Sequence, residues 1–233
     1  MAYYSGPCGA AMKLYHFWFE AASERIRLAL SFKSVTYQLI VPDYDDDETF
    51  FDLGVARSVP VVCWDDGHID AGRADLLQEI DRRVPALSLF APLAAGQWEF
   101  LCDWRTSADE ILARLHAPVR PAYLGIGDND AHLASYKATV QTRFGASLES
   151  LANDRYAAYA QLDSLTHLKA LGAYVARHRF YAGDLSAADI LLTADLFPLQ
   201  LLDGVTLPID LMYYFERVQE SCHVNLRDGL IAG

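Results

Sequence analysis

The spacing of hydrophobic residues changes part-way along the chain. Up to about residue 86, short β-prone runs alternate with helical stretches, whereas from Trp98 onward almost every segment repeats its apolar residues with helical spacing. This pattern predicts an α/β domain followed by an all-α helical bundle. The expected divisions are a disordered extension over residues 1–11, an α/β domain over 12–86, a linker over 87–97 and a helical domain over 98–233.

The β-prone runs occur in an order that specifies a mixed sheet. The first run leads into a helix with Ile26, Ala29 and Leu30 on one face, and the last two runs are joined by a hairpin turn, Asp65-Asp66-Gly67. A parallel β-α-β unit followed by a hairpin predicts a four-stranded mixed sheet covered by helices. Strands are expected over 13–19, 35–41, 58–64 and from His68, with a helix over 71–83.

The rest of the chain predicts five helices with glycines and prolines at the breaks between them. Ser186, followed three residues later by Asp189, predicts a capping box at the start of a buried helix, with a structural role. The helices are expected over 98–115, 131–153, 155–177, 186–202 and 208–221.

Composition and charge exclude several classes of function. A hydrophobic content of 52% supports a packed core, and a net charge of −12 disfavours nucleic acid and anionic membranes as partners. No apolar run reaches the length of a membrane span, and the N-terminus lacks a secretory signal, so a cytoplasmic protein with a small-molecule or protein partner is expected. The acidic run Asp43–Glu48 is interpreted as a solvated loop rather than a metal site. The cysteines have no metal-ligand or CxxC spacing and are interpreted as reduced thiols: Cys8, Cys63, Cys102 and Cys222.

Three features in order resemble the glutathione transferase superfamily: the β-α start at Lys13, the Val59-Pro60 strand entrance, and the segment from Ser186 to Asp189. The resemblance implies a thioredoxin-like N-terminal domain, a helical C-terminal domain and glutathione as cosubstrate. It also implies a cis Val59-Pro60 bond that turns the Val59 backbone toward the ligand. Within the superfamily the chain is most similar to the two-domain bacterial glutaredoxins, on the residues Asp65-Asp66-Gly67-His68, Leu196-Phe197-Pro198-Leu199 and Val224-Asn225-Leu226.

The loop expected to carry the chemistry lacks the usual nucleophile. The Cys-Pro-Tyr-Cys of the two-domain glutaredoxins matches Glu20-Ala21-Ala22-Ser23 here, which excludes dithiol redox chemistry at this position. Ser23 is either a hydrogen-bond donor to a glutathione thiolate or a plain helix N-cap. Glu20 is a candidate general base, although a carboxylate beside a thiolate raises the thiol pKa.

Other candidate site residues flank this loop or follow the hairpin. His16 and Trp18 precede it, with a core role as the alternative for His16. Where the family holds the γ-glutamyl end of glutathione with a Glu/Gln-Ser pair, this chain has Gly72-Arg73, or Ala71-Gly72 if the match shifts by one residue. Arg73 either pairs with a ligand carboxylate or fills the pocket.

Three functions follow as alternatives. The first is a glutathione-dependent transferase or isomerase acting on a small electrophile, with Val59, Pro60, Gly72, Arg73 and Trp18 binding the cosubstrate. The second is a non-redox, glutaredoxin-like protein that binds another small acidic or aromatic ligand through Arg73, Glu20 and an aromatic cluster. The third is a non-catalytic interaction protein, because function does not follow from fold alone. The aromatic cluster comprises Tyr15, Phe17, Trp18 and Phe19.

The resemblance leaves two oligomeric states open. Most transferases of this fold imply a homodimer, whereas the two-domain glutaredoxins imply a monomer.

Overall fold

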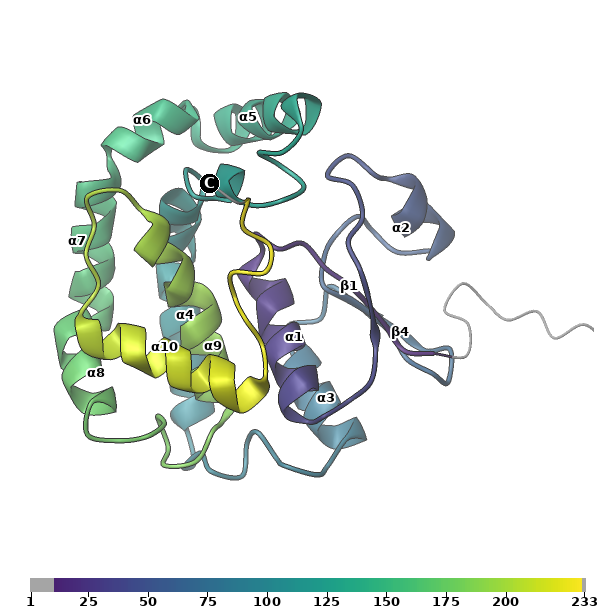
Figure 1. Cartoon of the computed structure of the whole chain (residues 1–233), viewed down its shortest axis with the longest axis vertical. Helices are drawn as coiled ribbons and strands as arrows, with labels where there is room; N and C mark the ends of the chain where they lie inside the picture. The colour runs from purple at the N-terminus through teal and green to yellow at the C-terminus, as the bar shows by residue number, and fades with distance from the viewer. Residues whose placement is uncertain (1–10, 232–233) are drawn as a thin grey trace, which may run out of the picture.

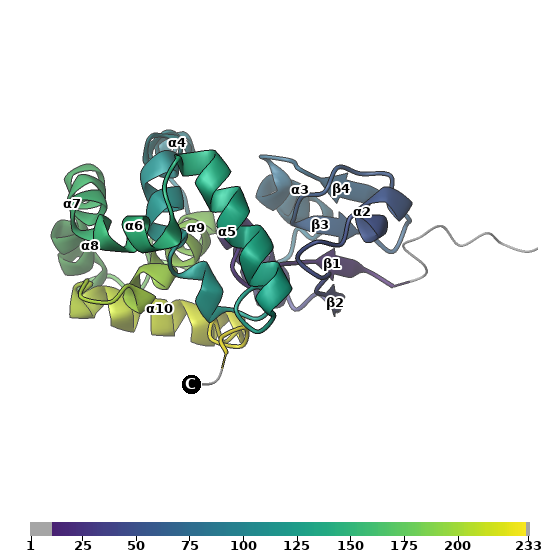
Figure 2. The same ribbon diagram turned by 90° about the horizontal axis from the view of Figure 1, so that it is seen from above.

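The computed structural model of the chain describes residues 11–231. Apart from residue 11, the expected N-terminal extension over residues 1–11 lies outside this range, as does Cys8. The described part consists of a small sheet with its covering helices on one side and a helical bundle on the other (Figures 1 and 2). This confirms the predicted combination of a thioredoxin-like domain and an all-α domain.

The sheet has the mixed topology that the order of the β-prone runs predicted. Its four strands lie in the order β2-β1-β3-β4, with β1 parallel to β2 and antiparallel to β3, and β3 antiparallel to β4. Leu14, in the central strand β1, pairs with Leu39 on one side and Val62 on the other. The strands are β1 (Lys13–Tyr15), β2 (Gln38–Ile40), β3 (Val61–Cys63) and β4 (Ile69–Ala71).

Three helices accompany the sheet, and one of them begins later than predicted. Helices α1 (Ala21–Phe32) and α3 (Leu76–Arg83) pack against each other, while α2 (Glu48–Asp52) follows the acidic loop. The helix expected from Ala71 starts at Leu76, because Ala71 completes β4 and Gly72 then turns the chain with a φ of 63°. Glycine adopts this left-handed backbone without the steric penalty of a side chain.

The helical part contains more breaks than the hydrophobic pattern predicted. The helix expected over 131–153 is divided at Gly145, and that expected over 155–177 is divided at His167, where φ is 66° and 51° respectively. The α-helices are α4 (Gln97–His116), α5 (Asp130–Phe144), α6 (Leu148–Asn153), α7 (Arg155–Thr166), α8 (Leu168–Val175), α9 (Ala187–Leu196) and α10 (Ile209–Cys222), and the short 3₁₀ helices are η1 (Arg120–Ala122) and η2 (Phe197–Leu201).

Helix α9 is the buried centre of the helical part, and its predicted capping box is present. Every residue of α9 is buried, and the Asp189 carboxylate accepts hydrogen bonds from the Ser186 N–H at 2.8 Å and the Tyr181 N–H at 2.7 Å. The Tyr214 hydroxyl donates a further bond at 2.7 Å. Burial raises the pKa of Asp189, and these donors offset the desolvation of its charged form. The motif is structural, as expected.

Helix α1 joins the two parts of the molecule. It packs on α3 from the sheet side and on α9 and α10 from the helical side, which places it at the centre of Figure 1. The Arg27 guanidinium donates to the Asn225 carbonyl at 3.0 Å and to Asp228 at 3.2 Å, which ties α1 to the C-terminal segment.

The state of the cysteines differs from the expectation at one position. Cys102 and Cys222 are free thiols, whereas Cys63 is in a disulfide bond, so the expectation of a reduced thiol is wrong at Cys63.

Within residues 11–231, no helix has both the length and the apolar character needed to cross a membrane.

Candidate functional site

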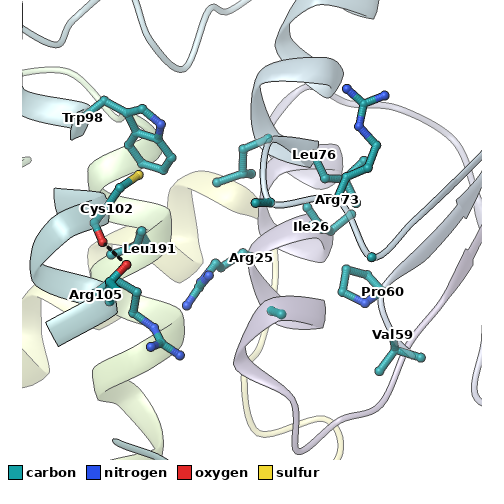
Figure 3. Close-up of a pocket in the computed structure, with 15 residues that line it drawn as sticks. Arg25, Ile26, Val59, Pro60, Arg73, Leu76, Trp98, Cys102, Arg105 and Leu191 are labelled. Atoms are coloured by element: carbon teal, nitrogen blue, oxygen red, sulfur yellow. Dashed lines mark hydrogen bonds between the residues drawn. The ribbon is translucent and has the colours of Figure 1, made fainter. Parts of the chain in front are cut away.

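A cleft of about 420 Å³ lies between the sheet side of the molecule and the helical side (Figure 3). One wall comes from α1, the loop before β3 and the turn between β4 and α3, and the other comes from α4 and α9. A cleft of this volume fits a small organic ligand. The residues that line it are Ala22, Arg25, Ile26, Val59, Pro60, Gly72, Arg73, Ala74, Leu76, Leu77, Trp98, Cys102, Arg105, Thr106 and Leu191.

The sheet-side wall contains four of the residues suggested by the sequence. The Val59-Pro60 bond is cis, as the resemblance implied. Gly72 and Arg73 follow β4 in the adjacent turn and line the same cleft as Val59 and Pro60. The structure therefore brings these four candidate ligand-binding residues together, although they come from two separate loops.

Arg73 is engaged by acidic side chains of its own loop. Its guanidinium forms a two-point hydrogen-bonded pair with Asp75, with N–O distances of 2.9 and 2.8 Å, and donates from Nη1 to Asp70 at 2.9 Å. Hydrogen bonds from Arg73 to Asp75 and then Asp70 raise its pKa. The guanidinium points away from Arg25 and Arg105 (Figure 3). Arg73 thus borders the cleft without filling it.

The N-terminus of α1 is occupied by an ion pair. Glu20 is the N-cap residue of α1, and its Oε1 lies 2.8 Å from Nη2 of Arg120. The Arg120 guanidinium also lies over the Phe19 ring, 5.6 Å from its centroid. Neither Glu20 nor Arg120 lines the cleft. The position expected to hold a nucleophile therefore carries a carboxylate that already has a cationic partner.

Ser23 has a structural environment. The side chain is fully buried, and its Oγ accepts a hydrogen bond from the Phe17 N–H at 3.4 Å. The N-cap hypothesis for Ser23 is wrong, because α1 begins at Ala21 and Glu20 is the cap. Ser23 does not line the cleft. Its hydroxyl instead ties the first turn of α1 to the preceding loop through the bond from Phe17.

His16 and Trp18 lie on the opposite side of α1 from the cleft. His16 is fully buried, its Nε2 lies 3.2 Å from Oε1 of Glu24, and its ring meets that of Trp18 edge-on at 4.6 Å. Trp18 lies under the Arg27 guanidinium, and Gly229 packs so closely that a Cβ there would be 2.3 Å from Trp18 Cγ. Neither side chain reaches the cleft.

An arginine from each wall belongs to a cluster that the sequence reasoning missed. Arg25 from α1 and Arg105 from α4 converge on Asp195, a fully buried carboxylate of α9. Arg25 Nη2 lies 2.7 Å from both carboxylate oxygens, and Arg105 Nε lies 3.1 Å from Oδ1. One sequence signal could have found this cluster: Asp195 lies in a largely apolar helix, and a buried carboxylate requires a nearby cation.

Two further residues of α4 complete this wall. Trp98 presents an aromatic ring, and Cys102 lies between it and Arg105 (Figure 3). Burial raises the pKa of the Cys102 thiol. The thiol is therefore protonated at neutral pH, and Cys102 is a lining residue rather than an activated nucleophile.

No family model matches the sequence, and no curated protein matches it. Solved structures match nearly all of the chain. Glutaredoxin 2 of Salmonella typhimurium, in complex with glutathione, superposes with a TM-score of 0.75 at 18% identity, over 94% of this chain and 97% of that one. A glutathione S-transferase of Ceriporiopsis subvermispora, also in complex with glutathione, gives 0.69 at 15% identity, over 91% and 96%. This chain has the glutathione-transferase fold.

A third structure extends the range of functions found on this glutathione-transferase fold. Maleylacetoacetate isomerase of Methylobacterium extorquens, with bound malonate and glutathione, gives a TM-score of 0.56 at 18% identity, over 91% of this chain and 94% of that one. The expected fold is therefore confirmed, while identities below 20% leave activity to be argued from the site itself.

Proposed function

We propose that the protein is a glutathione S-transferase-like enzyme, a glutathione-dependent transferase or isomerase that acts on a small electrophile. The observation that carries the proposal is the cleft in which the cis-proline loop and the β4–α3 turn face helix α4. Glutathione lies along Val59, Pro60 and Gly72 on the sheet-side wall, and the electrophile lies against α4. Structures of this fold with bound glutathione support this choice of cosubstrate.

The thiol is activated in this proposal by the Arg25 guanidinium rather than by a serine hydroxyl. Arg25 lines the cleft and Ser23 does not, and a nearby cation lowers the pKa of a thiol. The negative charge of Glu20 is balanced by Arg120, which reduces the repulsion that a free carboxylate would exert on a thiolate. In the transferase case, the thiolate sulfur bonds to the electrophilic carbon, the leaving group departs with its electron pair, and the thiol proton passes to water.

A second candidate is a non-redox relative that binds a different small acidic ligand. The buried hydroxyl of Ser23 and the arginines in the cleft favour it. The aromatic cluster that the sequence suggests for such a ligand does not support this candidate, because Tyr15, Phe17 and Phe19 are buried in the core. In this version, Arg25 and Arg105 take the place of Glu20 and the aromatic residues.

Calorimetric titration of glutathione separates the two candidates. Wild type and Ser23→Ala are expected to bind glutathione with affinities within about twofold, since Ser23 lies outside the cleft. Ala74→Trp places a large ring in the cleft from an exposed position and is expected to weaken binding at least tenfold. Ala138→Trp, at an exposed position of α5 outside the cleft, serves as the matched control. Absence of heat with wild type, or equal binding by both tryptophan variants, contradicts the glutathione-dependent proposal.

A further inference from the structure

The cleft holds two guanidinium groups in fixed positions, one on each wall. Arg25 reaches from α1 and Arg105 from α4, so the pair spans both sides of the cleft (Figure 3). Both are anchored to Asp195, whose side chain is fully buried, while the side chains of Arg25 and Arg105 retain 19% and 23% exposure. The anchor removes much of the conformational freedom that a flexible arginine would otherwise lose on binding a ligand.

The anchor uses only part of the hydrogen-bonding capacity of each guanidinium. Among residues 11–231, Arg25 donates from Nη2 alone, and only to Asp195. Arg105 donates from Nε to Asp195 and from Nη1 to the exposed Asp109 at 2.7 Å. Because an arginine carries five N–H donors, Arg25 Nη1 and Arg105 Nη2 keep N–H groups for a ligand. These groups match the oxygens of a carboxylate.

The remainder of the cleft suits an apolar group attached to that carboxylate. Trp98 and Leu191 lie on the helical wall, and Ile26 and Leu76 face them from α1 and α3. None of the residues that line the cleft is acidic. A small ligand with one flat apolar end and one anionic end matches both features.

We infer that the electrophile accepted by this cleft carries a carboxylate, which Arg25 and Arg105 bind while Trp98 and Leu76 hold the apolar body. The inference rests on the proposed function, since it names the class of the second substrate in that reaction.

Two probes of nearly equal shape test the requirement for negative charge. Calorimetric titration of wild type with 3-nitrobenzoate and with 3-nitrobenzamide compares a carboxylate with its neutral amide. The carboxylate is expected to bind at least about tenfold more tightly, as charge-assisted hydrogen bonds to arginine provide. Equal affinities for the two probes overturn the inference.

Variants of Arg105 and its neighbour locate the effect. Arg105→Gln leaves Arg25 to pair with Asp195 and is expected to reduce the preference for the carboxylate below about threefold. Asp109→Asn, an exposed change that releases Arg105 Nη1, is expected to strengthen 3-nitrobenzoate binding severalfold.

Arg143→Gln is the matched control, because Arg143 is an exposed arginine of α5 paired with Glu110 at 3.7 Å. If Arg105→Gln does not fold, Asp109→Asn decides, and unchanged or weaker binding contradicts the inference.

Glutathione titration of the same proteins distinguishes this inference from the proposed function. Arg105→Gln is expected to keep its glutathione affinity within about threefold while losing the carboxylate preference. Glutathione binding without any preference for 3-nitrobenzoate overturns the inference and leaves the proposed function intact. A preference for 3-nitrobenzoate without glutathione binding overturns the proposed function, and the arginine pair then serves the second candidate, an acidic ligand alone.

Discussion

The N-terminal end of helix α1 and its cleft-facing side, less than two turns apart, differ in whether their polar groups already have partners. At its N-terminal end, Glu20 is paired with Arg120 and Ser23 is buried against the Phe17 backbone. On its cleft-facing side, Ala22 and Arg25 border an open volume, and Arg25 keeps N–H groups without a partner among the described residues.

The difference shows that the guanidinium available to bind an anion lies on the cleft-facing side of α1 and not at its N-terminus. A helix N-terminus stabilises an anion through its free N–H groups, and here a side-chain ion pair stands at that place. The adjacent face instead offers a guanidinium anchored by Asp195. If the N-terminal end is structural and the cleft-facing side functional, substitutions at the two places affect stability and ligand binding differently.

The largest effect is expected at Asp195. Asp195→Asn keeps the shape of the side chain but removes the charge shared by Arg25 and Arg105, and it is expected to lower the free energy of unfolding by about 3 to 5 kcal/mol. Asp109→Asn, which alters an exposed partner of Arg105, is expected to lower it by less than about 1 kcal/mol. Urea unfolding measures both, and similar values would show that Asp195 does not organise this wall.

A pH effect of slightly smaller size is expected at His116. This buried residue of α4 contacts the Asp195 carbonyl through Nε2 at 2.9 Å, and burial lowers its pKa to about 4. The unfolded state, with a pKa near 6.5, takes up the proton first, so stability is lost as pH falls from about 6.5 to about 4. The loss attributable to His116 is roughly 3 kcal/mol.

His116→Gln isolates this contribution, because a glutamine amide can donate to the same carbonyl but does not titrate. The difference in unfolding free energy between wild type and His116→Gln is expected to change across pH 6.5 to 4 and to be constant above pH 7. Parallel pH profiles would contradict the assignment to His116.

Ser23→Ala tests the N-terminal end of α1 directly. Loss of the buried acceptor leaves the Phe17 N–H without its bond, which is expected to cost about 1 kcal/mol of stability in urea unfolding. Glutathione affinity is expected to stay within about twofold. A loss of glutathione binding or of turnover larger than the loss of stability explains would show that Ser23 belongs to the functional site.

The smallest effect is expected at Glu20. Its pair with Arg120 is partly exposed, with side-chain exposures of 30% and 21%, so Glu20→Gln is expected to change stability by less than about 1 kcal/mol. Binding of 3-nitrobenzoate in the cleft is expected to remain unchanged. A marked change in that affinity, measured by calorimetry, would show that the two regions of α1 are coupled.

Local patterns were sufficient for the secondary-structure order but not for every boundary. The hairpin turn Asp65-Asp66-Gly67 and the spacing of Ser186 and Asp189 depend on a few neighbouring residues, and both features are present. The break at His167 was missed, because a histidine at a φ of 51° is held there by its surroundings and not by its own preference.

The candidate site was predicted in part. Val59, Pro60, Gly72 and Arg73 lie together in the cleft, and their positions after recognisable strand and turn signals made them accessible to sequence reasoning. Ser23 was interpreted from its nearness to the helix start, yet a difference of three residues turns a side chain from the cap into the core.

By itself, the sequence determined the order of strands and helices along the chain, the all-helical second part and the absence of a nucleophilic cysteine near the start of α1, since periodicity and residue identity are local properties. Only the tertiary structure decided where the cationic groups meet. Arg25, Arg105 and Asp195 belong to three helices and are far apart along the chain, and their pairing follows from the need of one buried carboxylate for nearby cations.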